Sequence, residues 1–152
     1  MFHRFRYEAD IYPALTRIPL HVRMKLDLIG AKISLKDWLA FGLEERIVLC
    51  HLPVDLEEEK LVFRAHLDFL SRKYRGDPLM TIAPLSAALW DNVTQVPKPV
   101  VERSIEKRNQ VTLEEWARWK VHQRYALYKT AISKNDPEQF FAVLDELREQ
   151  TD

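Results

Sequence analysis

The sequence is poor in cysteine and glycine, and neither sign of charge is in excess. Cys50 is the only cysteine among 152 residues, so an intrachain disulfide and a multi-cysteine metal site are both excluded. Lysine plus arginine equals aspartate plus glutamate at 23 each, whereas nucleic-acid-binding proteins usually carry a basic excess that neutralises phosphates. No apolar run approaches the roughly 20 residues of a membrane-spanning helix, and the N-terminal segment lacks the apolar core of a signal peptide. These absences predict a protein of the reducing cytoplasm that binds neither nucleic acid nor a membrane.

The composition that remains is that of a folded helical protein. Hydrophobic residues make up 47% of the chain and charged residues 30%, as in ordinary globular domains. The three glycines stand where helices would end, and they are too few for a turn-rich β protein. We therefore expect one all-α domain over residues 1–152, and no segment is predicted to be a strand.

One stretch of the chain occurs twice. Residues 18–52 align without a gap to residues 96–130, 78 positions later, and residues 63–70 match 140–147 after a shift of one. This internal duplication predicts a compact helical bundle of about seven to nine helices. The pseudo-repeats are expected at about 18–75 and 96–150, with an ordered connector at about 76–95. The identical pairs in the ungapped alignment are Pro19/Pro97, Val22/Val100, Leu35/Leu113, Trp38/Trp116, Arg46/Arg124 and Leu49/Leu127.

The first helix of the first copy is bounded by Pro19, which suits a first turn, and by Gly30, which suits a left-handed C-terminal residue. This helix is apolar on two sides. One apolar arc becomes polar in the second copy, so the first copy is either the central helix of the fold or the contact for a partner protein. The residues of that arc are Leu20, Met24 and Leu28.

Capping residues mark the next helix of each copy. Ser34 and Thr112 are predicted N-caps, and each is followed three residues later by a carboxylate. Gly42 is expected to divide the first copy into two helices. Lys120 takes its place in the second copy, so the helix over residues 113–132 is expected to be continuous or bent. Further helices are expected from residue 56 to about 75 and from residue 137 to about 149.

Four matched residues are assigned structural roles. Trp38 and Trp116 lie in stripes of helical spacing that are typical of a core. Arg46 and Arg124 are flanked by apolar residues, and a guanidinium there needs a carboxylate or the carbonyl groups of a helix end.

Motifs of catalysis are missing from the sequence. The five histidines have no HxxxH spacing, and there is no glycine-rich phosphate loop or nucleophile elbow. Cys50 and His51 would point about 100° apart on a helix, which favours a buried, unreactive thiol over an activated one. We predict that the protein is not an enzyme and has no catalytic residue, metal or cofactor.

The segment YEADIYPALTRIPLHVRMKLDLIGAKISLKDW, followed by Glu45-Arg46 shortly before LCHLP, resembles the nitrate reductase associated protein family of cyanobacteria and other bacteria. The resemblance continues through Trp116 and QRYAL at residues 123–127. It implies a cytoplasmic helper that supports assimilatory nitrate reductase and has no catalytic site of its own. The matching motif positions are Glu8-Ala9-Asp10, Ile18-Pro19, Val22-Arg23, Lys25-Leu26-Asp27, Gly30 and Lys32.

On this basis we predict an accessory protein that docks on the apo-enzyme and keeps it competent to receive its cofactors. The motif charges that helical packing explains least are the candidate contacts, with an internal salt-bridge network as their alternative role. The alternative function is a small-molecule sensor or carrier, with a tryptophan-lined pocket between the two repeats. The candidate contacts are Glu8, Asp10, Arg23, Lys25, Asp27 and Lys32.

Overall fold

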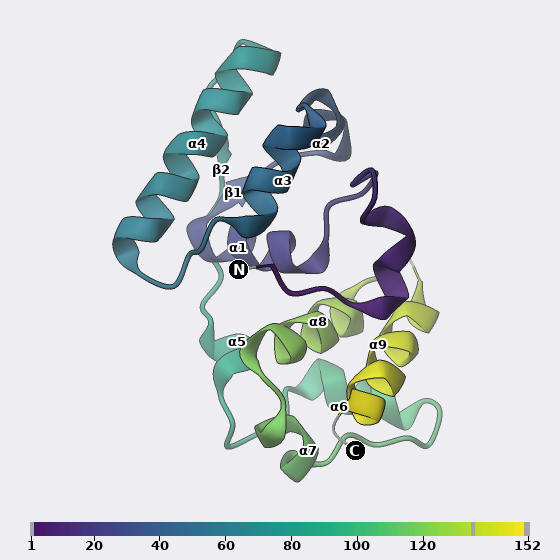
Figure 1. The fold of residues 1–152 in the computed structure, drawn as a ribbon. Helices are drawn as coiled ribbons and strands as arrows, with labels where there is room; N and C mark the ends of the chain where they lie inside the picture. The colour runs from purple at the N-terminus through teal and green to yellow at the C-terminus, as the bar shows by residue number, and fades with distance from the viewer. Residues whose placement is uncertain (1, 135, 151–152) are drawn as a thin grey trace. The chain divides into compact units, whose positions relative to one another are not determined.

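The computed structural model describes residues 2–134 and 136–150, and helices dominate it (Figure 1). Nine α-helices, one 3-10 helix and one pair of two-residue strands occur in these ranges, which confirms the all-α class. The chain divides into two compact units. The first comprises the chain up to Arg4 together with Glu8–Leu85, and the second comprises Phe5–Tyr7 together with the chain from Ser86 onward.

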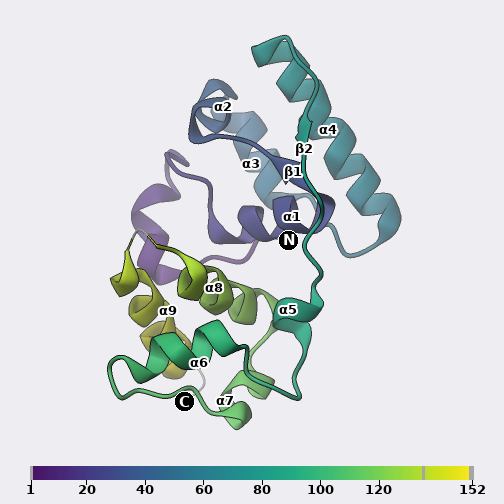
Figure 2. The same cartoon turned by 180° about the vertical axis from the view of Figure 1, so that it is seen from behind.

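The first unit is built around α1 (Leu20–Ile29) and α4 (Glu57–Arg75), with α2 (Leu35–Ala40) and α3 (Leu43–His51) between them in the chain. The 3-10 helix η1 (Arg6–Ile11) precedes them. In both views the segment that follows α4 runs back along that helix (Figure 2). Asp68 of α4 holds this segment by accepting a hydrogen bond from Leu79 N at 2.9 Å.

The returning segment contains one of two short strands that the sequence did not predict. β1 (Ala31–Lys32) pairs antiparallel with β2 (Met80–Thr81), with Ala31 opposite Thr81. Two residues per strand are too few to show an alternation of apolar and polar side chains, so periodicity cannot detect them.

The helix ends of the first unit follow the predicted signals. Gly30 ends α1 with φ +73°, and Gly76 ends α4 with φ +77°, both in the left-handed region. Ser34 caps α2, since its hydroxyl accepts from Asp37 N at 3.0 Å and the Asp37 carboxylate accepts from Ser34 N at 3.0 Å. These contacts satisfy backbone groups that a helix terminus leaves unpaired.

In the second unit α8 (Val121–Ile132) is central, because α5, α6 and α9 all pack against it. Its buried tyrosine, Tyr125, meets Trp90 of α5 edge to face, with ring centroids 4.9 Å apart. The other helices of this unit are α5 (Ala88–Asp91), α6 (Lys98–Ile105), α7 (Leu113–Arg118) and α9 (Pro137–Gln150).

The prediction of a continuous or bent helix over residues 113–132 is wrong. α7 ends at Arg118, and Trp119 and Lys120 are extended before α8 begins. Lys120 N donates to the Gln123 side-chain oxygen at 2.8 Å, just as Gly42 N donates to Glu45 at 2.7 Å. Gly42 itself has φ −65°, which any residue adopts. The break therefore depends on the acceptor three residues later rather than on glycine.

The helices of the two units begin at matching positions. α1 and α6, α2 and α7, and α3 and α8 each start 78 residues apart, which is the offset of the sequence alignment. The matched tryptophans also make the same kind of bond, since Trp38 Nε1 donates to Leu15 O and Trp116 Nε1 to Asn92 O, both at 2.8 Å. The elements agree in order and local contacts, while a duplication of the whole fold stays a prediction.

Candidate functional site

The six charged motif residues all lie in the first unit, but they differ in how far they are buried. Glu8 and Lys25 are buried, with 4% and 1% of their surface exposed. Asp10, Arg23 and Lys32 are exposed, and Asp27 is half-buried. The motif therefore contains both internal and surface charges.

Glu8 stabilises the N-terminus of α1. Its two carboxylate oxygens accept hydrogen bonds from Leu20 N at 3.3 Å, and Tyr12 donates its hydroxyl to the carboxylate at 2.8 Å. Burial raises the pKa of Glu8, while the bonds from Tyr12 and Leu20 act in the opposite direction. An anion at this position also complements the helix dipole.

Lys25 stabilises the C-terminus of α3. Its Nζ donates to Leu49 O at 3.2 Å and to Cys50 O at 2.7 Å, and it lies 5.9 Å from the Phe63 ring centre. Burial lowers the pKa of Lys25 to about 8, and burial raises the pKa of the neighbouring Cys50 thiol to about 12. This thiol is buried and protonated at neutral pH, as the sequence analysis favoured.

The contact assignment is therefore corrected for Glu8 and Lys25, because a partner cannot reach either side chain. Their partners are backbone groups and a tyrosine hydroxyl rather than the opposite charges of a salt-bridge network. The apolar arc on α1 is internal too, since Leu20 and Met24 are 5% and 7% exposed. α1 is thus the central helix of its unit.

Two of the surface charges of the motif make contacts within the first unit. Asp10 lies 3.6 Å from Arg17, and both side chains are more than half exposed. Arg23 Nε donates to Ile18 O at 3.2 Å, which holds the base of the side chain near the start of α1. The roles of Asp10, Arg23, Asp27 and Lys32 as partner contacts stay predictions.

The matched arginines bind the segment that precedes the first helix of each copy. Arg46 Nη1 donates to Ala14 O at 3.1 Å and to Leu15 O at 2.9 Å. Arg124 Nε donates to Trp90 O at 2.8 Å, and its Nη2 forms an ion pair with Asp91 at 2.9 Å. These bonds join α3 and α8 to chain that is distant in sequence.

An apolar surface that the sequence analysis missed lies on α3. Leu43, Ile47 and Val48 are 40–43% exposed, and we call these three side chains the α3 face. The residues 78 positions later than Ile47 and Val48 are Tyr125 and Ala126, which are 1% and 0% exposed. In the second unit α5 covers this side of α8 through Trp90. The signal in the sequence is a stretch that stays apolar in both copies, but only the structure shows which copy is covered.

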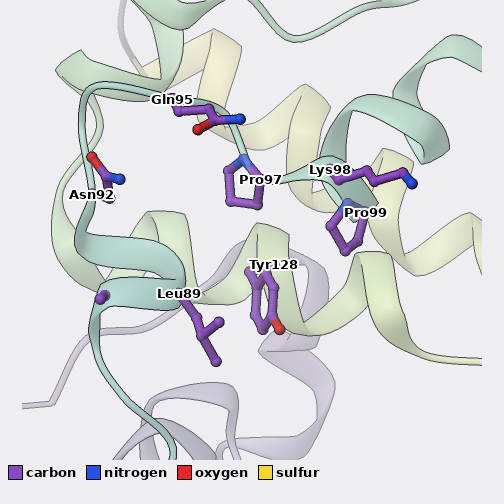
Figure 3. A pocket seen from close by; sticks show the side chains of 8 residues that line it. Leu89, Asn92, Gln95, Pro97, Lys98, Pro99 and Tyr128 are labelled. Carbon is purple, nitrogen blue, oxygen red and sulfur yellow. The ribbon is translucent and has the colours of Figure 1, made fainter.

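A pocket of about 290 Å³ lies within the second unit (Figure 3). The Tyr128 ring stands beside Pro97 and Pro99, with Asn92 and Gln95 on the adjoining loop. None of the lining residues is buried, and no tryptophan is among them. The pocket is a surface hollow rather than the tryptophan-lined cavity that the carrier hypothesis predicts. Its other lining residues are Ala88, Leu89 and Lys98.

Residues 2–134 and 136–150 contain no group of three or more histidine, cysteine, aspartate or glutamate side chains placed to hold a metal ion. They also contain no helix that is both long and apolar enough to cross a membrane.

Among known protein families, the chain matches the one described as conserved nitrate reductase-associated protein, over residues 4–147. The match spans both units and includes the whole motif from Glu8 to Lys32. No curated protein and no solved structure matches the chain.

Proposed function

We propose a function for this chain, which belongs to the conserved nitrate reductase-associated protein family. The protein is a non-catalytic, cytoplasmic accessory factor that supports assimilatory nitrate reductase. It acts by docking on the apo-enzyme, and the α3 face is the centre of the docking surface.

The observation that carries this proposal is the contrast between the α3 face and its counterpart on α8. Tyr125 and Ala126 are buried, and Tyr125 is in ring contact with Trp90 of α5, whereas Ile47 and Val48 are each 43% exposed. Covering the apolar side chains of a helix with another protein favours binding, by about 25 cal/mol per Å² of apolar surface removed from water. A helix of the reductase that packs on α3 would cover this face as α5 covers α8.

The exposed motif charges supply the polar part of the proposed contact. Arg23 and Lys32 are the cationic members, and Asp10 and Asp27 are the anionic ones. Charges at the rim of an interface mainly set the association rate and the choice of partner. Lys25 does not belong to this set, because reversing its charge would place a carboxylate against the carbonyl groups that end α3.

The test is capture of the tagged protein from nitrate-grown cells, with the retained proteins identified by mass spectrometry. We expect the nitrate reductase polypeptide with the native chain, and at least about tenfold less of it with Ile47→Asp. Val121→Asp is the matched control, since Val121 is 41% exposed and begins α8, where an aspartate is compatible with the helix. Arg23→Glu is expected to reduce capture at low salt more than at high salt.

Equal capture by Ile47→Asp and Val121→Asp, with native circular dichroism for both, would refute the α3 face as the docking surface. Recovery of the tagged protein alone with a co-purifying small molecule would refute docking and support the carrier hypothesis.

A further inference from the structure

The α4 helix is apolar on two opposite sides. Its inner side carries Phe63, Leu67 and Leu70, each 0% exposed. Its outer side carries a second row in which Leu61 is 63% exposed, Val62 58% and Phe69 59%. Ala65 lies in the middle of this row and is also exposed. We call Leu61, Val62, Ala65 and Phe69 the α4 outer row.

The fold of such a helix does not require an apolar outer row. When the alignment shifted by one is extended to the start of the helix, Leu61 and Val62 correspond in α9 to Glu138, which is exposed, and Gln139, which is half-buried. The counterpart of Phe69 is Glu146, which is buried in the second unit. α9 is nevertheless a regular helix over Pro137–Gln150, with an inner side that resembles that of α4. The apolar residues on the outside of α4 therefore point to an occupant other than the unit itself.

The charges of α4 are divided between its ends. Its first turn carries Glu57, Glu58 and Glu59, and its last turn carries Arg72, Lys73 and Arg75. A parallel neighbour with the same sequence would bring like charges together at both ends. An antiparallel neighbour with the same sequence would bring the acidic turn of each helix to the basic turn of the other.

We propose that the α4 outer row binds the same row of a second copy of this chain, with the two helices antiparallel about a twofold axis at Ala65. In this register Leu61 of each copy lies opposite Phe69 of the other, and Glu58 lies opposite Arg72. Ala65 meets its own copy at the axis, where a small side chain lets the helices approach closely. The surface is self-complementary, as an isologous twofold contact must be.

Both charged residues of this register are available to a partner. The side chain of Glu58 is exposed and has no ion pair or hydrogen bond within the described residues. The Arg72 side chain is 60% exposed, and its bond to Asp68 at 2.8 Å uses Nε and leaves the terminal nitrogens for a second carboxylate. A guanidinium can bind two acceptors in this way.

The extent of the row sets the strength of the dimer. A helix of 19 residues is roughly 28 Å long at about 1.5 Å per residue. One helix pair of this length is small beside the roughly 1,600 Å² of a standard interface, so we expect a reversible, concentration-dependent dimer.

The test is sedimentation equilibrium of the purified full-length protein over a wide concentration range, without any reductase. Glu58→Arg places arginine opposite arginine, and Arg72→Glu places glutamate opposite glutamate, so each is expected to weaken the dimer about tenfold or more. The double variant exchanges the two charges and is expected to restore the native affinity. It also opposes the helix dipole at both ends, so restoration cannot come from a more stable helix.

A matched pair of variants tests the apolar part. Phe69→Asp is expected to abolish the dimer, whereas Ile105→Asp, at a residue 51% exposed on α6, is expected to leave it unchanged. A native protein that stays monomeric at every concentration would overturn the proposal. So would a charge-exchanged double variant that dimerises no better than the single variants, or equal effects of Phe69→Asp and Ile105→Asp.

Discussion

Lys25 is a buried cation whose partners are backbone carbonyl groups rather than a carboxylate. The last carbonyl groups of α3 accept no hydrogen bond from their own helix, and they lie at the negative end of the helix dipole. An ammonium group placed there satisfies Leu49 O and Cys50 O while losing its hydration. The pKa of Lys25 is lowered because the cost of removing the ammonium group from water exceeds the stabilisation from its favourable contacts.

The first residue-scale prediction concerns stability at alkaline pH. The pKa of Lys25 falls from 10.5 to about 8 on folding, so between these values the unfolded chain binds more protons than the folded one. Above pH 10.5 Lys25 is uncharged in both the folded and the unfolded chain, so its burial does not lower the unfolding free energy. As pH falls from 10.5 to 8, charging of Lys25 favours the unfolded chain and this stability is lost. We expect the unfolding free energy of the native chain, relative to Lys25→Met, to rise by up to about 3 kcal/mol across this interval.

Denaturant titrations of both proteins at several pH values measure this difference. Cys50 titrates in both proteins, so its opposite contribution cancels to first order in the comparison. A difference that is constant with pH would show that Lys25 keeps its ordinary pKa.

The sequence could locate the candidate charges but could not sort them by burial. The two apolar arcs of α1 predict neighbours on two sides of this helix, and residues of both arcs are buried in the structure. Whether Lys25 meets solvent or the end of α3 depends on a contact between residues 24 and 25 positions apart, which helical spacing does not contain. The same limit applies to the α3 face, because α5 covers one copy and not the other.

At the scale of elements, two glycines next to helix ends have different physical roles. Gly30 has φ +73°, and a Cβ atom there would lie 2.4 Å from Ile82 O in the segment that pairs with β1. Gly42 has an ordinary backbone, and its added Cβ would meet only the flexible Glu45 carboxylate, at 3.2 Å. The first position requires glycine for two reasons and the second does not require it.

We therefore expect Gly30→Ala to lower the unfolding free energy by about 2 kcal/mol or more, through left-handed strain and displacement of the β2 segment. Gly42→Ala is expected to change it by less than about 1 kcal/mol. Chemical denaturation of the two variants in parallel gives the comparison. Similar losses for both would contradict the distinction.

Most elements could be predicted because their signals are local. Capping residues, glycines and prolines act within four residues of a helix end, so Ser34, Thr112 and Gly76 mark real boundaries. The error at Lys120 came from treating glycine as the cause of the break in the first copy. Gln123 was the local signal in the second copy, and it is as visible in the sequence as Glu45.

At the scale of the whole molecule, the chain passes between its two units three times, after Arg4, after Tyr7 and after Leu85. The short segment Phe5–Tyr7 belongs to the second unit. Phe5 is 2% exposed, Tyr7 N donates to Glu146 of α9 at 3.0 Å, and Arg6 pairs with Glu149. The segment Phe5–Tyr7 is thus part of a core made mainly by the chain from Ser86 onward.

Phe5→Ala is accordingly expected to destabilise the second unit rather than the first, by about 3 kcal/mol for loss of a buried phenylalanine. Amide hydrogen exchange should accelerate in α8 and α9. Phe2→Ala is the control, because Phe2 packs on His21 and His51 of the first unit and should affect α1 and α3 instead. Equal acceleration in both units for each variant would contradict this division.

The two units divide after Leu85, while the connector at about 76–95 stays a prediction. The placement of Phe5–Tyr7 could not be predicted. Tyr7 and Glu146 are 139 residues apart in the chain, and nothing in the aromatic pattern of the N-terminal segment specifies which core it enters.

The position of Phe5 also orders events during synthesis of the protein. The ribosome synthesises Phe5 before α9, the helix that supplies Glu146 and Glu149. The helices of the first unit can form while the rest of the chain is still being translated, because domains generally fold as units and N-terminal ones first. The second unit, to which Phe5 belongs, can be completed only after α9 has left the ribosome. A nascent chain stalled before Pro137 therefore exposes an aromatic side chain that the finished protein conceals.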